Sequence, residues 1–148
     1  MKIKRFTDYS LRVLIYLALK ENELVTIREV ADRYQISKNH LMKVVQDLNN
    51  KGFIIATRGN NGGIRLSRAP EQINIGQLVR ITEQDSTLVE CFGEDNQCVI
   101  TPVCQLKRMF DEAMDSFFTC LEQYSLADLS SGEHRVQLKT ILLVADPE

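Results

Sequence analysis

The sequence predicts a mainly α-helical fold with a small β-wing, in which a winged helix-turn-helix is joined to a long dimerisation helix. Three observations predict this class. Two short helical patterns flank a tight turn within residues 26–52, two β-branched stretches follow within residues 53–68, and a long amphipathic pattern covers residues 102–124. A helix-turn-helix followed directly by a hairpin is the pattern of a winged lobe. A chain of 148 residues, 44% hydrophobic and 26% charged, is long enough to bury such a core.

The first element is a helix expected to begin near residue 7. Thr7 can cap it, and Asp8 suits the positive end of the helix dipole. Apolar residues then recur at helical spacing: Leu11, Leu14, Ile15 and Ala18. The pattern therefore predicts an amphipathic N-terminal helix.

The next two helices form the predicted helix-turn-helix. Thr26 opens the first, with Glu29 three residues later as in a capping box. Ser37 opens the second, which should end at Gly52. Apolar residues face one another across the turn: Val30, Ala31 and Tyr34 on one helix, and Leu41, Val44, Val45 and Leu48 on the other.

The wing and the C-terminal elements follow in order. FIIATR and GIRLSR flank a tip of hairpin composition: Gly59, Asn60, Asn61 and Gly62. NIGQLVRITEQD predicts a short helix, and the cysteine-containing stretch after it predicts an irregular loop. A long helix is expected from Pro102 to about Tyr124, with an apolar seam of Leu106, Phe110, Ala113, Phe117 and Leu121, and SLADL and RVQLKTILLV should pack against it.

These elements divide the chain into three expected parts. Residues 1-80 are expected to form the winged helix-turn-helix domain, residues 81-101 a short helix end and the loop that holds Cys91 and Cys98, and residues 102-148 the dimerisation helix and C-terminal segments. The length of the predicted long helix and its aromatic seam favour a homodimer.

Charge separates the two halves of the chain. Residues 1–68 hold 13 Lys/Arg and 6 Asp/Glu, a net charge of +7, whereas residues 69–148 carry −9. A basic lobe favours a polyanion, because each phosphate contact releases condensed counterions. Double-stranded DNA is therefore the expected partner of the first half, and a winged fold used only for protein contacts is the weaker interpretation.

The candidate DNA-binding residues lie on the second helix of the pair and in the wing. The helix offers Lys38, Asn39, His40 and Lys43 in its first exposed turns, which enter a major groove in such motifs. The wing offers Arg58, Asn60, Asn61 and Arg65 around a tip narrow enough for a minor groove. A solvated turn is the alternative for the two asparagines.

Three cysteines within fourteen residues indicate metal or redox chemistry. Cys91, Cys98 and Cys104 have the spacing C-x6-C-x5-C, which is wider than the usual zinc knuckle and leaves an iron-sulfur cluster or a thiol switch. Three unrelated thiols are the remaining alternative. Cys120 lies between Phe117 and Leu121 of the apolar seam and is expected in the core. His40 and His134 are poor candidates for a fourth ligand, since one lies among the DNA readers and the other in a polar turn.

Taken together, several stretches resemble the nitric-oxide-sensing branch of the winged-helix iron-sulfur regulators, the IscR/NsrR-type family. These stretches are FTDYSLRVLIYLA, ISKNHLMKVVQDL, RGNNGGIRL, the three cysteines ending in ITPVCQLK, and YSLADL. The resemblance covers nearly the whole chain. It implies a homodimer with a long dimerisation helix, a cluster loop at the base of that helix, and two lobes that bind a pseudo-palindromic operator.

The resemblance also implies a ligand set. In the IscR branch a histidine three residues beyond the last cysteine completes the site, but Lys107 occupies that position here. In the nitric-oxide-sensing branch the fourth ligand is a carboxylate near the N-terminus of the other subunit, and the matching residue is Asp8. The alternative for Asp8 is a helix-start acid paired with Arg12.

The function expected on these grounds is that of a homodimeric transcriptional repressor whose iron-sulfur cluster, of the 4Fe-4S type with 2Fe-2S as the alternative, senses nitric oxide. A regulator of iron-sulfur status or a metal-free thiol switch is a second possibility, and an iron-sulfur electron carrier a third. No activated nucleophile or phosphate-binding loop is recognisable, so no enzyme is expected. The apolar run at residues 13–19 is too short to span a bilayer, and a cytoplasmic protein with no membrane partner is expected.

Overall fold

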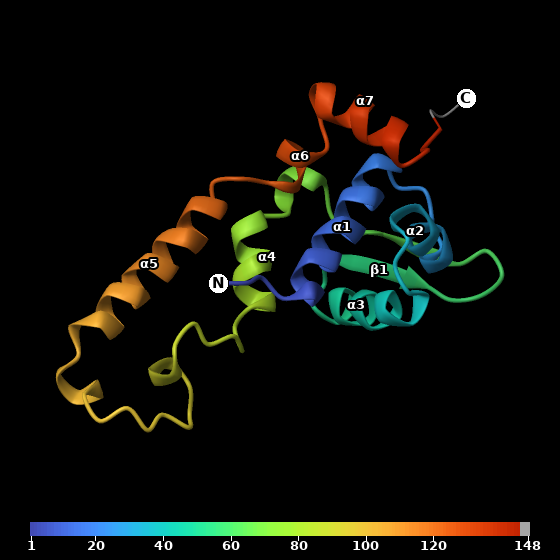
Figure 1. The fold of residues 1–148 in the computed structure, drawn as a ribbon. Helices are drawn as coiled ribbons and strands as arrows, with labels where there is room; N and C mark the ends of the chain where they lie inside the picture. Colours follow the sequence, from blue (N-terminus) through green and yellow to red (C-terminus); the bar gives the residue numbers. More distant parts are fainter. Residues whose placement is uncertain (146–148) are drawn as a thin grey trace.

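The computed structural model describes residues 1–145 and confirms a mainly helical fold with one two-stranded sheet (Figure 1). Its helices and strands are α1 (Arg5–Leu19), α2 (Ile27–Tyr34), α3 (Lys38–Asn50), β1 (Ile54–Thr57), β2 (Gly63–Leu66), α4 (Ile75–Thr82), α5 (Gln105–Leu121), α6 (Leu126–Leu129) and α7 (Gly132–Ile141). Single 3-10 turns lie at η1 (Pro70–Gln72), η2 (Glu90–Phe92) and η3 (Thr101–Val103). None of the helices within residues 1–145 has the length and apolar character needed to cross a membrane.

The hydrophobic core lies in the N-terminal lobe, where α1 and α2 both pack against α3. Its innermost side chains come from α1, α2, α3 and β1 and include Val13, Leu14, Val30, Leu41, Leu48 and Ile54. The predicted caps at Thr26 and Ser37 are confirmed, since their hydroxyls accept from the backbone N–H groups of Glu29 and His40. The carboxylate of Glu29 accepts from the Tyr16 hydroxyl (2.6 Å). Local caps and tertiary burial together therefore fix the helix-turn-helix.

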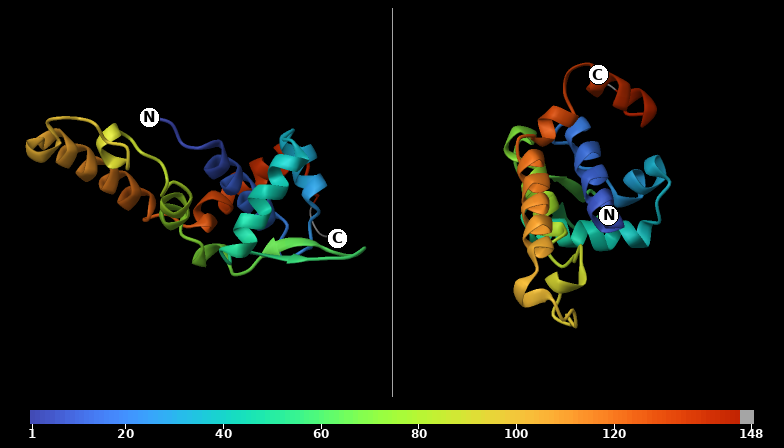
Figure 2. Two further views of the ribbon diagram at one scale, coloured as in Figure 1. Left: turned by 90° about the horizontal axis from the view of Figure 1, so that it is seen from below. Right: turned by 60° about the vertical axis from the view of Figure 1, so that its left-hand side comes forward.

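The predicted hairpin is confirmed as the antiparallel pair of β1 and β2, with Ile54 opposite Leu66 and Thr57 opposite Gly63. It projects from the lobe as a narrow wing (Figure 2). Gly62 closes the tip, because a Cβ atom at this position would lie 2.2 Å from the carbonyl oxygen of Thr57. The wing tip is therefore held in one tight geometry by its backbone.

Helix α5 extends away from the lobe on the side opposite the wing (Figure 1). It is shorter than the expected helix from Pro102 to Tyr124, because Pro102 lies in η3 and Cys104 is the N-cap residue. None of the residues 105–121 is buried, although α5 packs along α4. The expectation that Cys120 lies in the core is wrong, since its side chain is exposed. Of the apolar seam, Phe117 and Leu121 are partly buried against the core of the lobe, whereas Leu106 near the start of α5 is 54% exposed.

The C-terminal segments return to the N-terminal lobe. The expectation that they pack against the long helix is wrong: α6 packs against α1 and η1, and Leu126 is buried in the core of the lobe. Arg135 of α7 donates to the carbonyl oxygens of Ala18 and Leu19 at the end of α1 (both 3.2 Å). His134 lies in α7 and not in a turn. Carbonyl groups left free at a helix end attract a guanidinium, which explains this docking.

Candidate nucleic-acid interface and metal site

Helix α3 carries four of the candidate DNA-binding residues. Lys38, Asn39 and Lys43 are exposed on its outer side. His40 is half-buried, because its ring packs edge-on against Tyr9 of α1, with 4.8 Å between the ring centroids. The structure thus leaves three of the four side chains free to reach a ligand, whereas His40 also joins α3 to α1.

A groove of about 840 Å³ runs between α3, the start of α2 and the wing. It is lined by Lys38 and Arg58 from the expected set and by residues that the sequence reasoning missed: Arg28, Met42, Gln46 and Asn49. The missed residues on α3 lie four, eight and eleven positions after Lys38. Such spacing places them on the same helix face, so helical periodicity could have identified them.

The wing residues are not all at the tip. Arg58, Asn60 and Asn61 are exposed there, whereas Arg65 lies within β2, opposite Ile55, and is half-buried. The Arg65 guanidinium donates to the carbonyl oxygen of Leu66 (3.4 Å). The structure therefore brings the first three together and sets Arg65 apart from them.

The first turn of α1 presents Asp8 beside Arg12. The guanidinium donates to both carboxylate oxygens, from Nε to Oδ1 (3.1 Å) and from Nη2 to Oδ2 (2.8 Å). It also lies over the rings of Tyr9 and Tyr34, at 5.4 and 6.0 Å from their centroids. Both members of the ion pair remain partly exposed. Asp8 is thus accessible at the surface of the lobe, but paired within its own chain.

The expectation that Thr7 caps α1 is wrong, since Lys4 is the N-cap residue and Thr7 is fully buried. The Thr7 hydroxyl donates to Oε1 of Glu83 (2.6 Å), a residue that follows α4. Burial alone would raise the pKa of Glu83, but hydrogen bonds from Thr7, Ser86 and Lys4 outweigh it and hold this pKa below its ordinary value. Glu83 is therefore a buried carboxylate that stays ionised.

The structure brings two of the three candidate cysteine ligands together. Cys91 and Cys104 line a cavity of about 530 Å³ together with Lys107, Arg108 and Asp111. Cys98 is exposed and lies outside this cavity, in a turn where its N–H donates to Asn96 (3.0 Å). Within residues 1–145 no three Cys, His, Asp or Glu side chains lie close enough to hold a metal ion. Three thiolates suit the chemistry of iron-sulfur ligation, but a single chain does not close the site.

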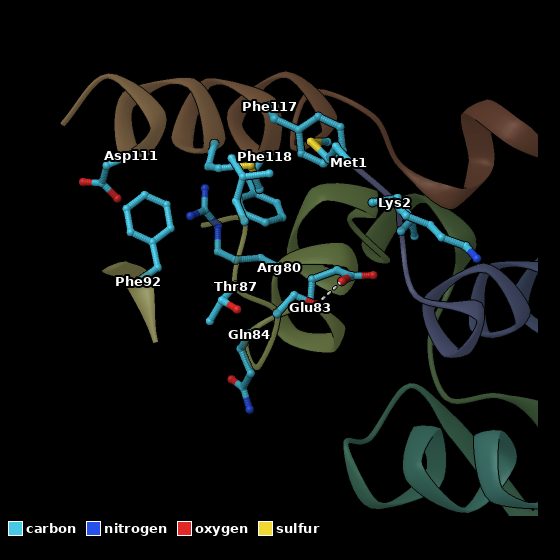
Figure 3. A pocket seen from close by; sticks show the side chains of 14 residues that line it. Met1, Lys2, Arg80, Glu83, Gln84, Thr87, Phe92, Asp111, Phe117 and Phe118 are labelled. Carbon is cyan, nitrogen blue, oxygen red and sulfur yellow. Dashed lines mark hydrogen bonds between the residues drawn. The ribbon is translucent and has the colours of Figure 1, made fainter. Parts of the chain in front are cut away.

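A second cavity, of about 370 Å³, adjoins this loop and shares Phe92 and Asp111 with the first. Figure 3 shows it between α4, which carries Arg80 with Glu83 at its end, and α5, which carries Phe117 and Phe118. The Arg80 guanidinium lies 4.8 Å from the centroid of the Phe118 ring and pairs with Glu122 (2.7 Å). These contacts fix the direction of α5 relative to α4.

Comparison with known proteins identifies the family. Residues 3–132 match the model of the Rrf2 family, described as an iron-dependent transcriptional regulator. The chain is 51% identical over 139 residues to the HTH-type transcriptional regulator NsrR of Bacillus licheniformis, covering 93% of this chain and 97% of that protein. It is also 51% identical over 138 residues to NsrR of Bacillus subtilis, covering 92% and 94%. The resemblance seen in the sequence is thereby confirmed.

Solved structures support the same fold. The global cysteine regulator CymR of B. subtilis superposes with a TM-score of 0.68 at 24% identity, covering 88% of this chain and 96% of that one. IscR of T. potens gives a TM-score of 0.67 at 20% identity, covering 99% and 94%. Since the family model matches most of its length, the chain belongs to the Rrf2 family of DNA-binding transcriptional regulators.

Proposed function

We propose that this regulator is a homodimeric repressor that responds to nitric oxide through an iron-sulfur cluster. The cluster would be held by Cys91, Cys98 and Cys104 of one chain and by Asp8 of the other, and is expected to be of the 4Fe-4S type. The observation that carries the proposal is the cysteine loop at the base of α5, in a chain about half identical to proteins named NsrR.

The exposed state of α5 supports a homodimer. Leu106 and Met109 are each 54% exposed although both are large and apolar. Val99, Ile100 and Val103, in the loop before this helix, are exposed as well. Apolar side chains gathered along an unburied helix are typical of a surface covered by another chain. A second copy of α5 would cover them and place each cysteine loop near the partner's DNA-binding lobe.

The incomplete metal site supports ligation between subunits. Within residues 1–145, neither Asp8 nor any other Asp, Glu or His joins the three cysteines in a group of metal-ligating side chains. In the proposed dimer, Asp8 would reach the loop from the partner subunit. Its ion pair with Arg12 is partly exposed, and such pairs contribute only about 0–1 kcal/mol, so a metal could displace it.

The bound cluster would supply iron that reacts with nitric oxide. The protein would supply the linkage between the cysteine loop of one chain and the first turn of α1 of the other. Tyr9 in this turn contacts His40 on α3, the helix that carries the candidate DNA-binding residues. Loss of the linkage frees the lobe to turn. Two half-sites on DNA can be read together only when both lobes keep a fixed spacing, so operator binding weakens.

A metal-free thiol switch is the alternative, favoured by the shared cavity of Cys91 and Cys104 and by the absence of a three-donor metal site within residues 1–145. Native mass spectrometry of anaerobically purified protein separates the two. A mass increase equal to one cluster per chain supports the proposal, and a loss of two hydrogens on oxidation without iron supports the switch.

Nitric oxide sensing is tested by titration. Anaerobic addition of nitric oxide should bleach the visible absorption and release operator DNA over the same range. Single Cys→Ser changes at 91, 98 and 104 should each abolish cluster retention, while Cys120→Ser, on the exposed side of α5, is the matched control and should retain it. Operator DNA that stays bound after complete bleaching would exclude nitric oxide sensing.

A further inference from the structure

One buried carboxylate joins the segment leading to the cysteines to the first turn of α1. Glu83, which follows α4, is only 6% exposed. Its Oε1 accepts from the backbone N–H of Lys4 (2.8 Å) and from the Thr7 hydroxyl (2.6 Å). Its Oε2 accepts from the hydroxyl of Ser86 (2.7 Å). The two oxygens therefore hold two different segments of the chain.

The Oε1 side replaces the missing cap of α1. Lys4, the N-cap residue, makes no capping hydrogen bond with its own side chain. A carboxylate at a helix N-terminus satisfies a free N–H group and interacts favourably with the dipole. The carbonyl oxygen of Lys4 in turn accepts from the N–H of Asp8 (3.1 Å). Lys4 thus links the two residues, since its N–H binds Glu83 and its carbonyl oxygen binds the backbone of Asp8.

The Oε2 side reaches the start of the cysteine segment. Ser86 lies five residues before Cys91, and its own N–H donates to the carbonyl oxygen of Glu83 (2.8 Å). Backbone and side chain of Ser86 are therefore both held by the same residue. The turn at Ser86 and the first turn of α1 are thus held by the same carboxylate.

We propose that Glu83 is a positioning residue that sets the direction in which α1 presents Asp8, and that couples this direction to the segment carrying the cysteines. The inference rests on the proposed function, since it assumes that Asp8 ligates the partner's cluster. Each chain then holds its own Asp8 in place for the other subunit's site. Its Ser86, which precedes its own cysteine loop, binds the same Glu83 carboxylate.

A purely structural role makes a different prediction. If Glu83 only stabilised the lobe, its loss would weaken operator binding equally in cluster-loaded and apo protein. A positioning role acts only where Asp8 has a ligand to bind. The informative quantity is therefore the ratio of operator affinities between loaded and apo protein, measured by fluorescence anisotropy under anaerobic conditions.

The test uses two variants that remove different halves of the contact. Glu83→Gln keeps the size of the side chain but removes the charge that strengthens all its hydrogen bonds. Ser86→Ala removes only the contact to Oε2 and leaves the cap of α1 intact, so it is expected to fold. Each should lower the ratio about three- to tenfold, the range of a moderate coupling between two sites.

Matched controls change similar groups elsewhere in the same lobe. Glu29→Gln alters a carboxylate that accepts from the Tyr16 hydroxyl, and Ser10→Ala removes a hydroxyl that donates within α1 to the carbonyl oxygen of Phe6 (2.8 Å). Both should leave the ratio unchanged. Hydrogen exchange of the apo protein gives a readout without the cluster: Glu83→Gln should increase exchange in the first turn of α1, and Glu29→Gln should not.

A double-mutant cycle with Asp8→Ala completes the test. If Glu83 acts through Asp8, adding Glu83→Gln to Asp8→Ala should not lower the ratio further. Additive effects, or an unchanged ratio in both Glu83→Gln and Ser86→Ala, would overturn the positioning role while leaving the proposed function intact. A wild-type protein without a cluster, or an unchanged ratio in Asp8→Ala, would overturn the proposed function and the inference together.

Discussion

At the scale of single residues, the groove beside α3 separates contacts that give affinity from contacts that give specificity. Lys38 and Lys43 are exposed cations, which suit phosphate oxygens. Met42, one turn after Lys38, is 48% exposed and lines the groove with Lys38, whereas Lys43 lies outside the groove lining. A flexible apolar side chain among basic ones can contact the methyl group of a thymine in the major groove.

These two roles predict different salt dependences of DNA binding. Lys43→Ala should weaken binding to all sequences and reduce the slope of log K against log salt by about 0.9. Met42→Ala should weaken operator binding about three- to tenfold with an unchanged slope, as expected for the loss of one apolar base contact. Anisotropy titrations at several salt concentrations measure both. A changed slope for Met42→Ala would contradict the assignment.

Glu83 gives a prediction for acid stability. Its pKa in the folded protein lies below the ordinary value of 4.5, so its ionised form stabilises the fold. This contribution is fully present above pH 4.5 and is lost as the pH falls through the lower folded value. Urea unfolding at stepwise decreasing pH should therefore show a steeper loss of stability for the wild type than for Glu83→Gln. Parallel curves for the two proteins would show that the pKa of Glu83 is the same in the folded and the unfolded protein.

At the scale of elements, the sequence predicted the helix caps and the hairpin turn, which depend on neighbouring residues. Thr26 and Ser37 cap their helices as expected, and the glycines of the wing tip close the hairpin. The cap of α1 could not be predicted from the sequence near it. The acceptor for the N–H of Lys4 is the carboxylate of Glu83, which lies 79 positions further along the chain. Tertiary contacts of this kind leave no periodic pattern.

In the candidate site, too, local patterns were predictable and contacts between distant residues were not. Helical spacing indicated the outer face of α3, but the half-burial of His40 depends on Tyr9 of another helix. The seam on α5 is apolar as expected, and Phe117 and Leu121 are partly buried against the core, yet Cys120 between them is exposed. A pattern shows that a face will be buried, but not by which partner.

Helix α6 provides a stability test at this scale. Leu126 is fully buried in the N-terminal lobe, whereas Leu129 on the same helix is 37% exposed. Leu126→Ala should lower the free energy of unfolding by about 2–5 kcal/mol, through lost burial and the cavity left behind. Leu129→Ala should lower it by less than about 1 kcal/mol. Equal effects in chemical denaturation would show that α6 does not dock on α1.

Helix α5 provides a test of assembly. Leu106→Asp places a charge in the exposed apolar face proposed to meet a second copy, and should convert a dimer into a monomer in analytical ultracentrifugation. Val136→Asp changes an apolar and even more exposed position on α7 (67%, against 54% for Leu106) and is the control. Dissociation by both variants, or by neither, would contradict the assignment of the interface to α5.

At the scale of the whole molecule, the charges and the shape agree. The basic first half carries the groove and the wing, and the acidic second half includes α5, which extends in the opposite direction (Figure 1). DNA bound along the basic face would therefore lie away from the acidic helix, which reduces electrostatic repulsion. In a homodimer joined through α5, the two lobes would stand at the ends of one assembly and each could meet one half-site.

Ligation across such a dimer can be tested with a heterodimer that carries Asp8→Ala on one chain and Cys98→Ser on the other. If Asp8 ligates the partner's cluster, both changes fall on one site and the second site is intact, since it combines unaltered cysteines with the unaltered Asp8. The heterodimer should then hold about half the iron of the wild type, and the retained half should react with nitric oxide at the wild-type rate. If Asp8 ligates within its own chain, each site carries one defect and no wild-type phase remains. Differently tagged chains, purified in sequence under anaerobic conditions and followed by stopped-flow absorption, distinguish the two patterns.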